Sequence, residues 1–592
     1  MEKEPLLYRV TPEDLAGHLL RVQLRIAHPH PQGQVLSLPA WIPGSYLIRD
    51  FSRQIISLQA ECAAQPLSVQ KRDSHTWQCE PCNGPLTIEY IVYAWDLSVR
   101  GAHVDESHAF FNGTSVFLMA HGLEHERHTV DLRAPSGKRN WQVYTSLPRA
   151  VGHPRCAREH GFGAYAAKDY DELIDHPVEM GTPQVVTFKA HGALHEMVFT
   201  GVAPNLDLQR IAADTRKICE AQIAFFEPRT RKAPFLDSAD RYVFMTMATG
   251  DGYGGLEHRA STALMTSRTD LPVKGRAEST ESYQNFLGLI SHEYFHTWNV
   301  KRIKPAAFAP YRLDRETHTR LLWVFEGFTS YYDDLMLLRA GVVSRDHYLK
   351  RLARVISMVH RSTGRLKQSV AESSFDAWTR YYKQDENSPN ALVSYYTKGS
   401  LVAAGLDLYI RHATNNRRSL DDAMRLLWTR YGRDFYRGRP TGIPEDGIAG
   451  LIREATGVDV AAFIDRYAHG REDVPLKRLM AWAGYTLQWT TPNGRPSLDV
   501  RTRIAHGETH LATVYEGGAA HRGGLSAGDV LVAIDGIRVG GDKSLDRLLD
   551  AYQGNDTVTV HVFRRDELRG YRVTLAPPAP TECRLTARES EK

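Results

Sequence analysis

The strongest chemical signal in the sequence is the run His292-Glu293-Tyr294-Phe295-His296. Two histidines four residues apart lie on one face of a helix, one turn apart, so both imidazoles can bind the same ion. Glu293 lies about 100° further round the helix, close enough to reach a water molecule beside that ion. Zinc suits two neutral imidazoles, and a catalytic zinc site keeps one position open for water. The run therefore predicts a zinc hydrolase with His292 and His296 as ligands and Glu293 as general base.

The same five-residue pattern also arises by chance, when two unrelated histidines share one helix face. The preceding residues favour the catalytic interpretation, because the apolar side chains of Phe286, Leu287, Leu289 and Ile290 suit a buried helix.

A catalytic zinc ion needs a third protein ligand, and Glu326 is the nearest good candidate. It stands in the apolar run 321–328, where an ionised carboxylate is costly to bury without a cation beside it. A zinc ion would supply that cation, whereas a structural ion pair with a buried arginine is the alternative. We therefore expect one zinc ion per chain, bound by His292, His296 and Glu326.

A glycine-rich segment after a predicted strand ends at Glu257. Gly254 and Gly255 allow a close approach of another backbone, so an extended peptide could lie along this edge as an added strand. The Glu257 carboxylate would then pair with the free α-ammonium group of the peptide and limit cleavage to the first peptide bond. The alternative is a glutamate that caps a turn.

Composition is that of an ordinary globular protein, with 42% hydrophobic and 24% charged residues. A length of 592 residues suggests roughly three or four domains. The formal net charge of +4 gives no reason to expect nucleic acid or an anionic membrane as partner.

The N-terminus lacks a secretory pattern, and no apolar run reaches the length of roughly 18 residues that spans a membrane. With only six cysteines, we expect a cytoplasmic protein. Cys79 and Cys82 could be half of a metal or redox site, but no second pair accompanies them, and we interpret them as structural or accidental.

The elements that must position these residues fall into three parts. Short runs with β-branched and aromatic residues predict an all-β, sandwich-like domain over residues 1–170, with strands at 19–26, 35–38, 86–93 and 141–145. An α+β catalytic domain follows over residues 171–477. Its expected elements are a strand at 242–247 and helices at 207–226, 283–298, 321–339, 346–360, 398–412 and 420–431.

The third part covers residues 478–577, with a short helix at 544–552 and strands at 485–489, 511–515, 530–534 and 558–563. Within it, the run from Gly517 to Val539 resembles a PDZ domain, since a Gly-Leu-x-x-Gly-Asp turn feeds an apolar strand and then Asp535-Gly536. PDZ domains capture a peptide C-terminus as an added strand. The segment 483–486 is a candidate carboxylate-binding loop, and packing without any ligand is the alternative. A proline-rich stretch leads to residues 578–592, which we expect to be a flexible tail.

The zinc motif followed by Glu326-Gly327-Phe328 resembles the gluzincin metallopeptidases, the group that includes aminopeptidase N and thermolysin. The step of 30 residues from His296 to Glu326 is longer than in aminopeptidase N relatives, and residues 304–319 look like an inserted loop. This insertion and the PDZ module are similar to the glycyl aminopeptidase family. Further stretches that match that family are 41–51, 169–175 and 299–305.

The resemblance implies a thermolysin-like catalytic domain and a substrate with a free N-terminus and a small first residue, Gly or Ala. It also implies that Tyr396, in a Tyr-x-Lys-Gly run, donates a hydrogen bond to the developing oxyanion, with neighbouring Tyr395 as the alternative donor and a purely structural aromatic residue as a further one. Residues 254–258 are similar to the exopeptidase motif of aminopeptidase N, with Leu256 and His258 in place of Met and Asn.

Two other functions remain open at this point. A zinc endopeptidase would use the same chemistry without Glu257 blocking longer substrates. A PDZ-based scaffold with an inactive protease-like domain is less compatible with the intact set of Glu293, His292, His296, Glu326 and Tyr396. The sequence does not give the oligomeric state.

Overall fold

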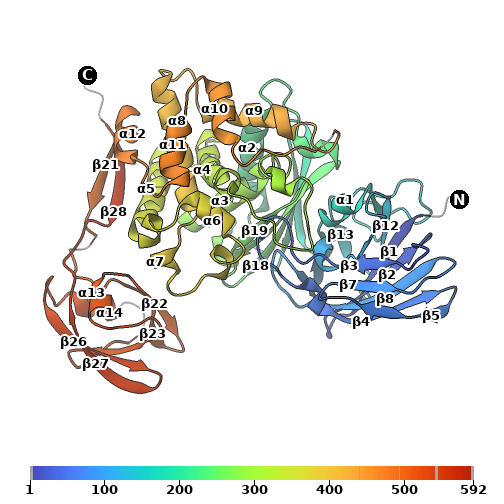
Figure 1. Cartoon of the computed structure of the whole chain (residues 1–592), viewed down its shortest axis with the longest axis horizontal. Coiled ribbons are helices and arrows are strands. Elements are labelled where there is room, and N and C mark those ends of the chain that lie inside the picture. The colour runs from blue at the N-terminus through green and yellow to red at the C-terminus, as the bar shows by residue number, and fades with distance from the viewer. Residues whose placement is uncertain (1–3, 439, 493, 541–543, 589–592) are drawn as a thin grey trace. The chain divides into compact units, whose positions relative to one another are not determined.

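The computed structural model describes residues 4–438, 440–492, 494–540 and 544–588 (Figure 1). The chain divides into two compact units, each assembled from separate stretches of sequence. The first unit comprises Met1–Thr317, Tyr332–Val343 and Met424–Pro444, and the second comprises His318–Tyr331, Ser344–Ala423 and Glu445–Lys592.

The first unit begins with a seven-stranded sheet, drawn in colours from blue to turquoise in Figure 1. Its central strands alternate buried and half-buried residues, which is the pattern of strands with one face on a core. The predicted strands 19–26 and 86–93 coincide with two of these. The order is β14 (Gly163–Ala167), β12 (His128–Leu132), β1 (Leu6–Asp14), β2 (Leu19–Ile26), β8 (Leu86–Tyr93), β4 (Ile55–Cys62) and β5 (Gln65–Leu67).

Two four-stranded sheets accompany it. One contains β11 (Met119–Ala120), β3 (Val35–Ser37), β7 (Thr76–Cys79) and β6 (Val69–Lys71). The other contains β13 (Gln142–Tyr144), β15 (Val178–Gly181), β10 (His108–Phe111) and β9 (Ala102–Val104). Because β15 pairs with β10 and β13, the chain beyond the expected boundary at residue 170 still contributes to the N-terminal sheets. The short helix α1 (Tyr170–Ile174), capped by the Asp169 side chain, precedes β15.

A five-stranded sheet carries the metal-binding motif. The parallel core β17–β18–β20 has antiparallel strands at both edges. Helix α3 (Glu281–Phe295) contacts β19 and β20 and begins at Thr280, whose side chain accepts from the Tyr283 amide. The strands are β16 (Gln184–Ala190), β17 (Ala193–Thr200), β18 (Arg241–Thr249), β20 (Ser261–Ser267) and β19 (Gly254–Glu257), and helix α2 (Leu208–Phe226) follows β17.

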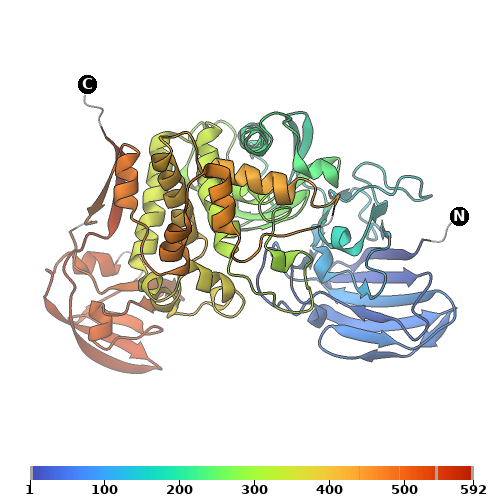
Figure 2. The same ribbon diagram turned by 45° about the horizontal axis from the view of Figure 1, so that its top comes forward.

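The second unit holds most of the later helices, which can be followed in Figure 2. Two of the expected continuous helices are partly π-helical, at Trp323–Gly327 before α4 (Phe328–Arg339) and at Trp428–Gly432 after α9 (Leu420–Leu427). The helices of this unit include α5 (Arg345–Arg361), α6 (Val370–Phe375), α7 (Ser388–Ala391), α8 (Thr397–Ala413), α10 (Ile448–Thr456), α11 (Ala461–Ile464) and α12 (Leu476–Trp482).

The PDZ-like part is a sheet with its own apolar core. Its path runs β22 (Val500–Ala505), β23 (Glu508–Val514), β24 (Val530–Ile534), β26 (Thr557–Arg564) and β27 (Glu567–Thr574), with β25 (Ile537–Arg538) paired to β24 and helices α13 (Ala519–Arg522) and α14 (Ser544–Leu549) against it.

Two expectations for the C-terminus are wrong. Residues 582–587, expected in a flexible tail, form β28 (Glu582–Ala587), which pairs with β21 (Tyr485–Thr490). The reason is the apolar cross-strand pair Leu487 and Leu585, both buried. The candidate ligand loop 483–486 leads into β21 and therefore lies outside the PDZ sheet. Residues 589–592 of the expected tail lie outside the described residues.

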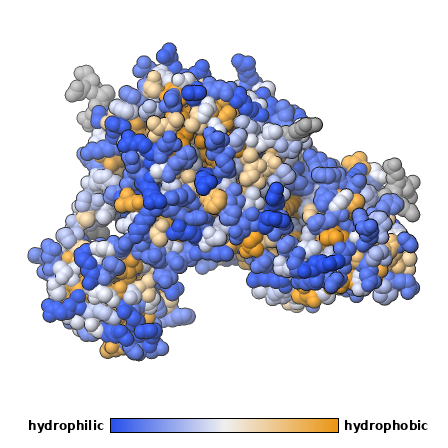
Figure 3. All heavy atoms as spheres, in the orientation of Figure 1, coloured by the Kyte–Doolittle hydropathy of each residue, from blue (hydrophilic) through white to orange (hydrophobic). Residues whose placement is uncertain are grey.

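Hydrophilic residues predominate on the face shown in Figure 3. Among the described residues, no helix is both long enough and apolar enough to cross a membrane.

Candidate metal centre and active site

His292 and His296 lie one turn apart at the C-terminal end of α3, with ring centroids 4.6 Å apart. His292 Nδ1 lies 2.9 Å from Asp333 Oδ2, and His296 Nδ1 lies 2.6 Å from the Asn299 carbonyl oxygen. Because a carboxylate and a carbonyl only accept hydrogen bonds, Nδ1 is the donor in both rings and the lone pair is on Nε2. Histidines that bind metal are commonly oriented by such a hydrogen bond.

Glu326 is buried in the π-helical segment Trp323–Gly327, a kind of distortion that is frequent at functional sites. The segment packs closely on α8, since a Cβ added to Gly327 would lie 2.7 Å from Gly399 Cα. Gly399 belongs to the Tyr-x-Lys-Gly run. The glycines of two predicted motifs thus touch each other, which sets the Glu326 segment directly against the start of the helix that follows Tyr396.

The metal-ligand geometry agrees with the donor set expected from the sequence. One ligand atom from each of His292, His296 and Glu326 lies within 4.8 Å of the other two. Two imidazoles and one carboxylate are the donors of a catalytic zinc site that keeps an open position.

A second cluster joins the expected general base to the expected substrate anchor. Ligand atoms of Glu257, Glu293 and His296 also lie within 4.8 Å of one another. Glu257 is buried, and its Oε1 has no hydrogen-bond partner among the described residues. A buried carboxylate oxygen without a partner is costly, so this one suits a cationic ligand such as an ammonium group.

Gly255 and Gly44 leave the space that the carboxylates of Glu293 and Glu257 occupy. A Cβ on Gly255 would collide with the Glu293 carboxylate, whereas one on Gly254 would meet nothing within 4 Å. Gly255, expected to admit a substrate backbone, therefore also makes space for the general base. Gly44, at φ +94°, would collide with Glu257 if it carried a Cβ. This gives the N-terminal stretch 41–51 a place at the site that sequence reasoning had not assigned.

Tyr395 and Tyr396 stack on each other with ring centroids 4.7 Å apart. Tyr396 is half-buried, and its hydroxyl oxygen lies 3.2 Å from that of Tyr382. Tyr395 is fully buried, and burial raises the pKa of its hydroxyl well above the usual value, with the Glu326 charge adding to the shift. Tyr396 is thus the more accessible of the two side chains.

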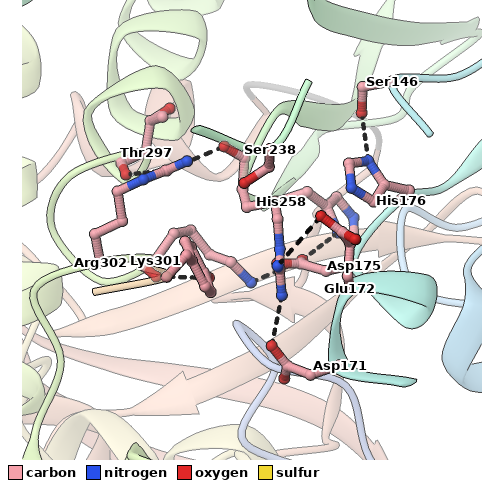
Figure 4. A network of polar contacts seen from close by, with 12 residues as sticks. Ser146, Asp171, Glu172, Asp175, His176, Ser238, His258, Thr297, Lys301 and Arg302 are labelled. Atoms are coloured by element: carbon pink, nitrogen blue, oxygen red, sulfur yellow. Dashed lines mark hydrogen bonds and ion pairs between the residues drawn. The ribbon is translucent and has the colours of Figure 1, made fainter. Parts of the chain in front are cut away.

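A buried network of charges adjoins the site (Figure 4). The Asp175 carboxylate accepts from His258 Nδ1 at 3.0 Å, Lys301 Nζ at 2.8 Å and Arg259 Nε at 3.1 Å. Burial raises the pKa of Asp175, but the Lys301 charge and the His258 hydrogen bond outweigh it and hold that pKa well below its usual range. Asp175 and Lys301 belong to the stretches 169–175 and 299–305, which match the glycyl aminopeptidase family in sequence, so these two stretches meet here. Their contacts also hold the chain that follows Glu257 and the chain that follows His296.

Asp333 and the Asn299 carbonyl, which orient the two histidines, were not predicted from the sequence. Asp333 follows Glu326 by seven residues, which is about two helical turns, and this spacing is the signal that could have found it. Burial raises the pKa of Cys79 to about 12 and that of Cys82 to about 11, and no cysteine within the described ranges belongs to one of the three metal-ligand groups.

His292, Glu293 and His296 stand at the end of a helix that packs on a five-stranded sheet, and the ligand atom of Glu326 lies within 4.8 Å of those of the two histidines. This arrangement is that of a metallopeptidase site. Comparisons with known proteins then give the family. Profiles described as the peptidase M61 N-terminal domain, M61 glycyl aminopeptidase and PDZ domain match residues 7–182, 285–402 and 510–565.

A crystal structure of an aminopeptidase N family protein from Idiomarina loihiensis shares 40% identity, covers 99% of this chain and 98% of its own, and superposes with a TM-score of 0.93. An M1 zinc metallopeptidase from Deinococcus radiodurans shares 13% identity over 80% of this chain and 95% of its own, with a TM-score of 0.47. Comparison with curated protein sequences returns no match.

The chain belongs to the M61 glycyl aminopeptidase family. It is a metallo-aminopeptidase with a C-terminal PDZ domain.

Proposed function

We propose that this zinc aminopeptidase removes the N-terminal residue, preferentially Gly or Ala, from peptides, and that it binds one zinc ion per chain through His292, His296 and Glu326. The observation that carries the proposal is the convergence of these three ligand atoms to within 4.8 Å. The preference for small residues comes from the family and not from an identified side-chain pocket.

The residues fit a zinc ion. In both imidazoles Nδ1 donates a hydrogen bond to an oxygen acceptor, so the lone pair is on Nε2 and available to a metal ion. The third metal ligand, Glu326, is a buried carboxylate. Asp333 and Glu326 stand about two turns apart on one continuous helical segment, so the acceptor for His292 and the third ligand share a helix face. When bound, zinc acts as a Lewis acid on the scissile carbonyl and lowers the pKa of water.

The protein's own groups divide the remaining work. Glu293 takes a proton from the attacking water and later passes it to the leaving amine. The Tyr396 hydroxyl donates to the oxyanion that forms on the former carbonyl oxygen. Glu257 pairs with the α-ammonium group, and its buried Oε1 gains the partner that the described residues do not provide. Because Glu257 and Glu293 are close, the anchor places the first peptide bond next to the base.

The direct test is Glu293→Gln, assayed on glycyl and alanyl reporters together with zinc analysis. Loss of the proton acceptor should lower kcat by about 10²–10⁴-fold, while bound zinc stays at the wild-type level. Near-normal turnover would remove Glu293 from the mechanism. Loss of zinc as well would show that the variant disturbs the ligands, and Glu257→Gln then tests the mechanism separately.

The exopeptidase assignment has its own test. Acetylating the N-terminus of a peptide removes the charge that Glu257 is proposed to bind, so hydrolysis should stop. Continued hydrolysis of the acetylated peptide would favour an endopeptidase. Capture of a peptide C-terminus by the PDZ domain and a cytoplasmic location remain part of the proposal, the latter supported by six cysteines without a disulfide.

A further inference from the structure

A third group of metal-ligand side chains lies on the hairpin formed by β9 and β10 and shares no residue with the two groups at α3. One ligand atom from each of His103, Asp105 and His108 lies within 4.8 Å of the other two. Both histidines are buried, at 4% and 3% exposed, and Asp105 is half-buried. Nothing in the peptidase chemistry uses these residues.

His108 is oriented in the same way as His292. Its Nδ1 lies 3.1 Å from Glu179 Oε1, and this carboxylate oxygen also accepts from Thr200 Oγ1 at 2.8 Å. The carboxylate makes Nδ1 the donor, so the lone pair of the ring is on Nε2. A carboxylate behind a histidine is the usual support for a metal ligand.

Asp105 keeps one oxygen for a ligand. Its Oδ1 accepts from the Ser107 amide, the Ser107 hydroxyl and the His108 amide. Its Oδ2 lies 3.2 Å from His103 Nε2. Two ligands on one tetrahedral zinc ion stand about 3.3 Å apart, so this spacing suits a shared ion as well as a hydrogen bond.

His103 leaves hydrogen-bonding capacity unused. Its Nδ1 is buried and has no hydrogen-bond partner among the described residues. Stacking on Trp95, with ring centroids 4.7 Å apart, fixes the orientation of the His103 ring.

The cluster is open on one side. A cavity of about 550 Å³ is lined by all three residues together with Thr200 and Arg268. An ion can therefore reach the hairpin and retain water as a further ligand. Two carboxylates, those of Asp105 and Glu179, stand beside two imidazoles, and this charge balance favours a divalent cation.

We propose that His103, Asp105 and His108 form a second binding site for a divalent transition-metal ion of the zinc type, with Glu179 as the carboxylate that positions His108. Two histidines and one carboxylate are a common donor set for such ions. The site is independent of the peptidase mechanism and would bring the number of ions per full chain to two.

The experiment is a titration of the metal-free full chain with Zn²⁺ against a chelating dye, which counts ions without relying on activity. The wild type should bind two ions. His292→Ala with His296→Ala should bind one, at the hairpin, and His103→Gln with His108→Gln should bind one, at α3. All four substitutions together should remove both ions.

One ion in the wild type, or two in the His103→Gln/His108→Gln variant, would overturn the proposal. Melting curves in chelator check that the hairpin variant folds. If it does not fold, Zn²⁺ is added to the His292→Ala/His296→Ala variant instead. A rise in its Tm that becomes smaller when Glu179→Gln is also present supports the hairpin site. An unchanged Tm contradicts the hairpin site.

Discussion

The two histidine groups, one on helix α3 and one on the β9–β10 hairpin, use similar donors but differ in how visible they are in sequence. On α3 the helical repeat alone puts His292 and His296 side by side, because four residues make about one turn. On the hairpin, His103 and His108 approach only because β9 pairs with β10 in a register that sets His103 opposite Phe110. A one-residue shift of that register would turn one histidine to the other face of the sheet.

The groups also differ in what surrounds them. The α3 group lies beside the proposed base, Glu293, and beside Glu257, a buried carboxylate of which Oε1 has no hydrogen-bond partner among the described residues. The hairpin group has no such neighbours within its own ligand cluster. We therefore assign turnover to α3 and ion binding alone to the hairpin.

After Glu293→Gln, the largest effect should come from Gly255→Ala, which separates ion binding from chemistry at α3. The added methyl group would collide with Glu293 and displace the base, so kcat should fall by about 10²-fold or more while zinc content stays the same. Gly254→Ala is the comparison on the same strand, because its methyl group meets no protein atom within 4 Å; it should keep kcat, and any loss should appear in KM, since Gly254 is expected to lie against the substrate backbone. Equal losses in both variants would mean that strand β19, and not the base, is what the substitution disturbs.

A smaller effect should follow from removing the supporting carboxylates, which compares the two groups directly. Asp333→Asn should weaken zinc binding at α3 by about 10–100-fold, and Glu179→Gln should do the same at the hairpin. Only Asp333→Asn should lower peptidase activity at limiting zinc. If Glu179→Gln lowered it equally, the hairpin would not be independent of the catalytic site.

The smallest effect concerns His195, a fully buried histidine outside both groups. Burial lowers its pKa to about 3, and its Nδ1 donates to the Ala193 carbonyl oxygen. Below about pH 6.5, the ordinary pKa of histidine, His195 binds a proton in the unfolded chain but stays neutral in the folded chain. The free energy of unfolding therefore falls as the pH drops from about 6.5 towards 3. His195→Gln should make this fall shallower by about 1.4 kcal/mol per pH unit, measured by denaturant unfolding in chelator. A slope equal to that of the wild type would contradict the assignment.

The periodicity of apolar residues predicted those strands and helices whose hydrophobic pattern and end signals lie within the element itself. Strands β2, β8 and β24 occupy the expected residues, and α2 begins after Asp207, whose side chain caps it. It did not predict the π-helical turn at Glu326, which packs through Gly327 on Gly399, a residue remote in sequence. Nor could it find β28, since its partner β21 is remote in sequence.

The sequence by itself predicted a zinc site, because His292, Glu293 and His296 fall on one stretch of a helix at the spacing of a metal-binding motif, and a glutamate in an apolar run needs a cation. Only the tertiary structure decided which groups orient the ligands, why Gly44 and Gly255 carry no side chain, and that three residues of a hairpin form another ligand cluster. The physical reason is distance along the chain. Local periodicity fixes which side chains share one turn, whereas contacts between remote segments depend on how whole elements pack.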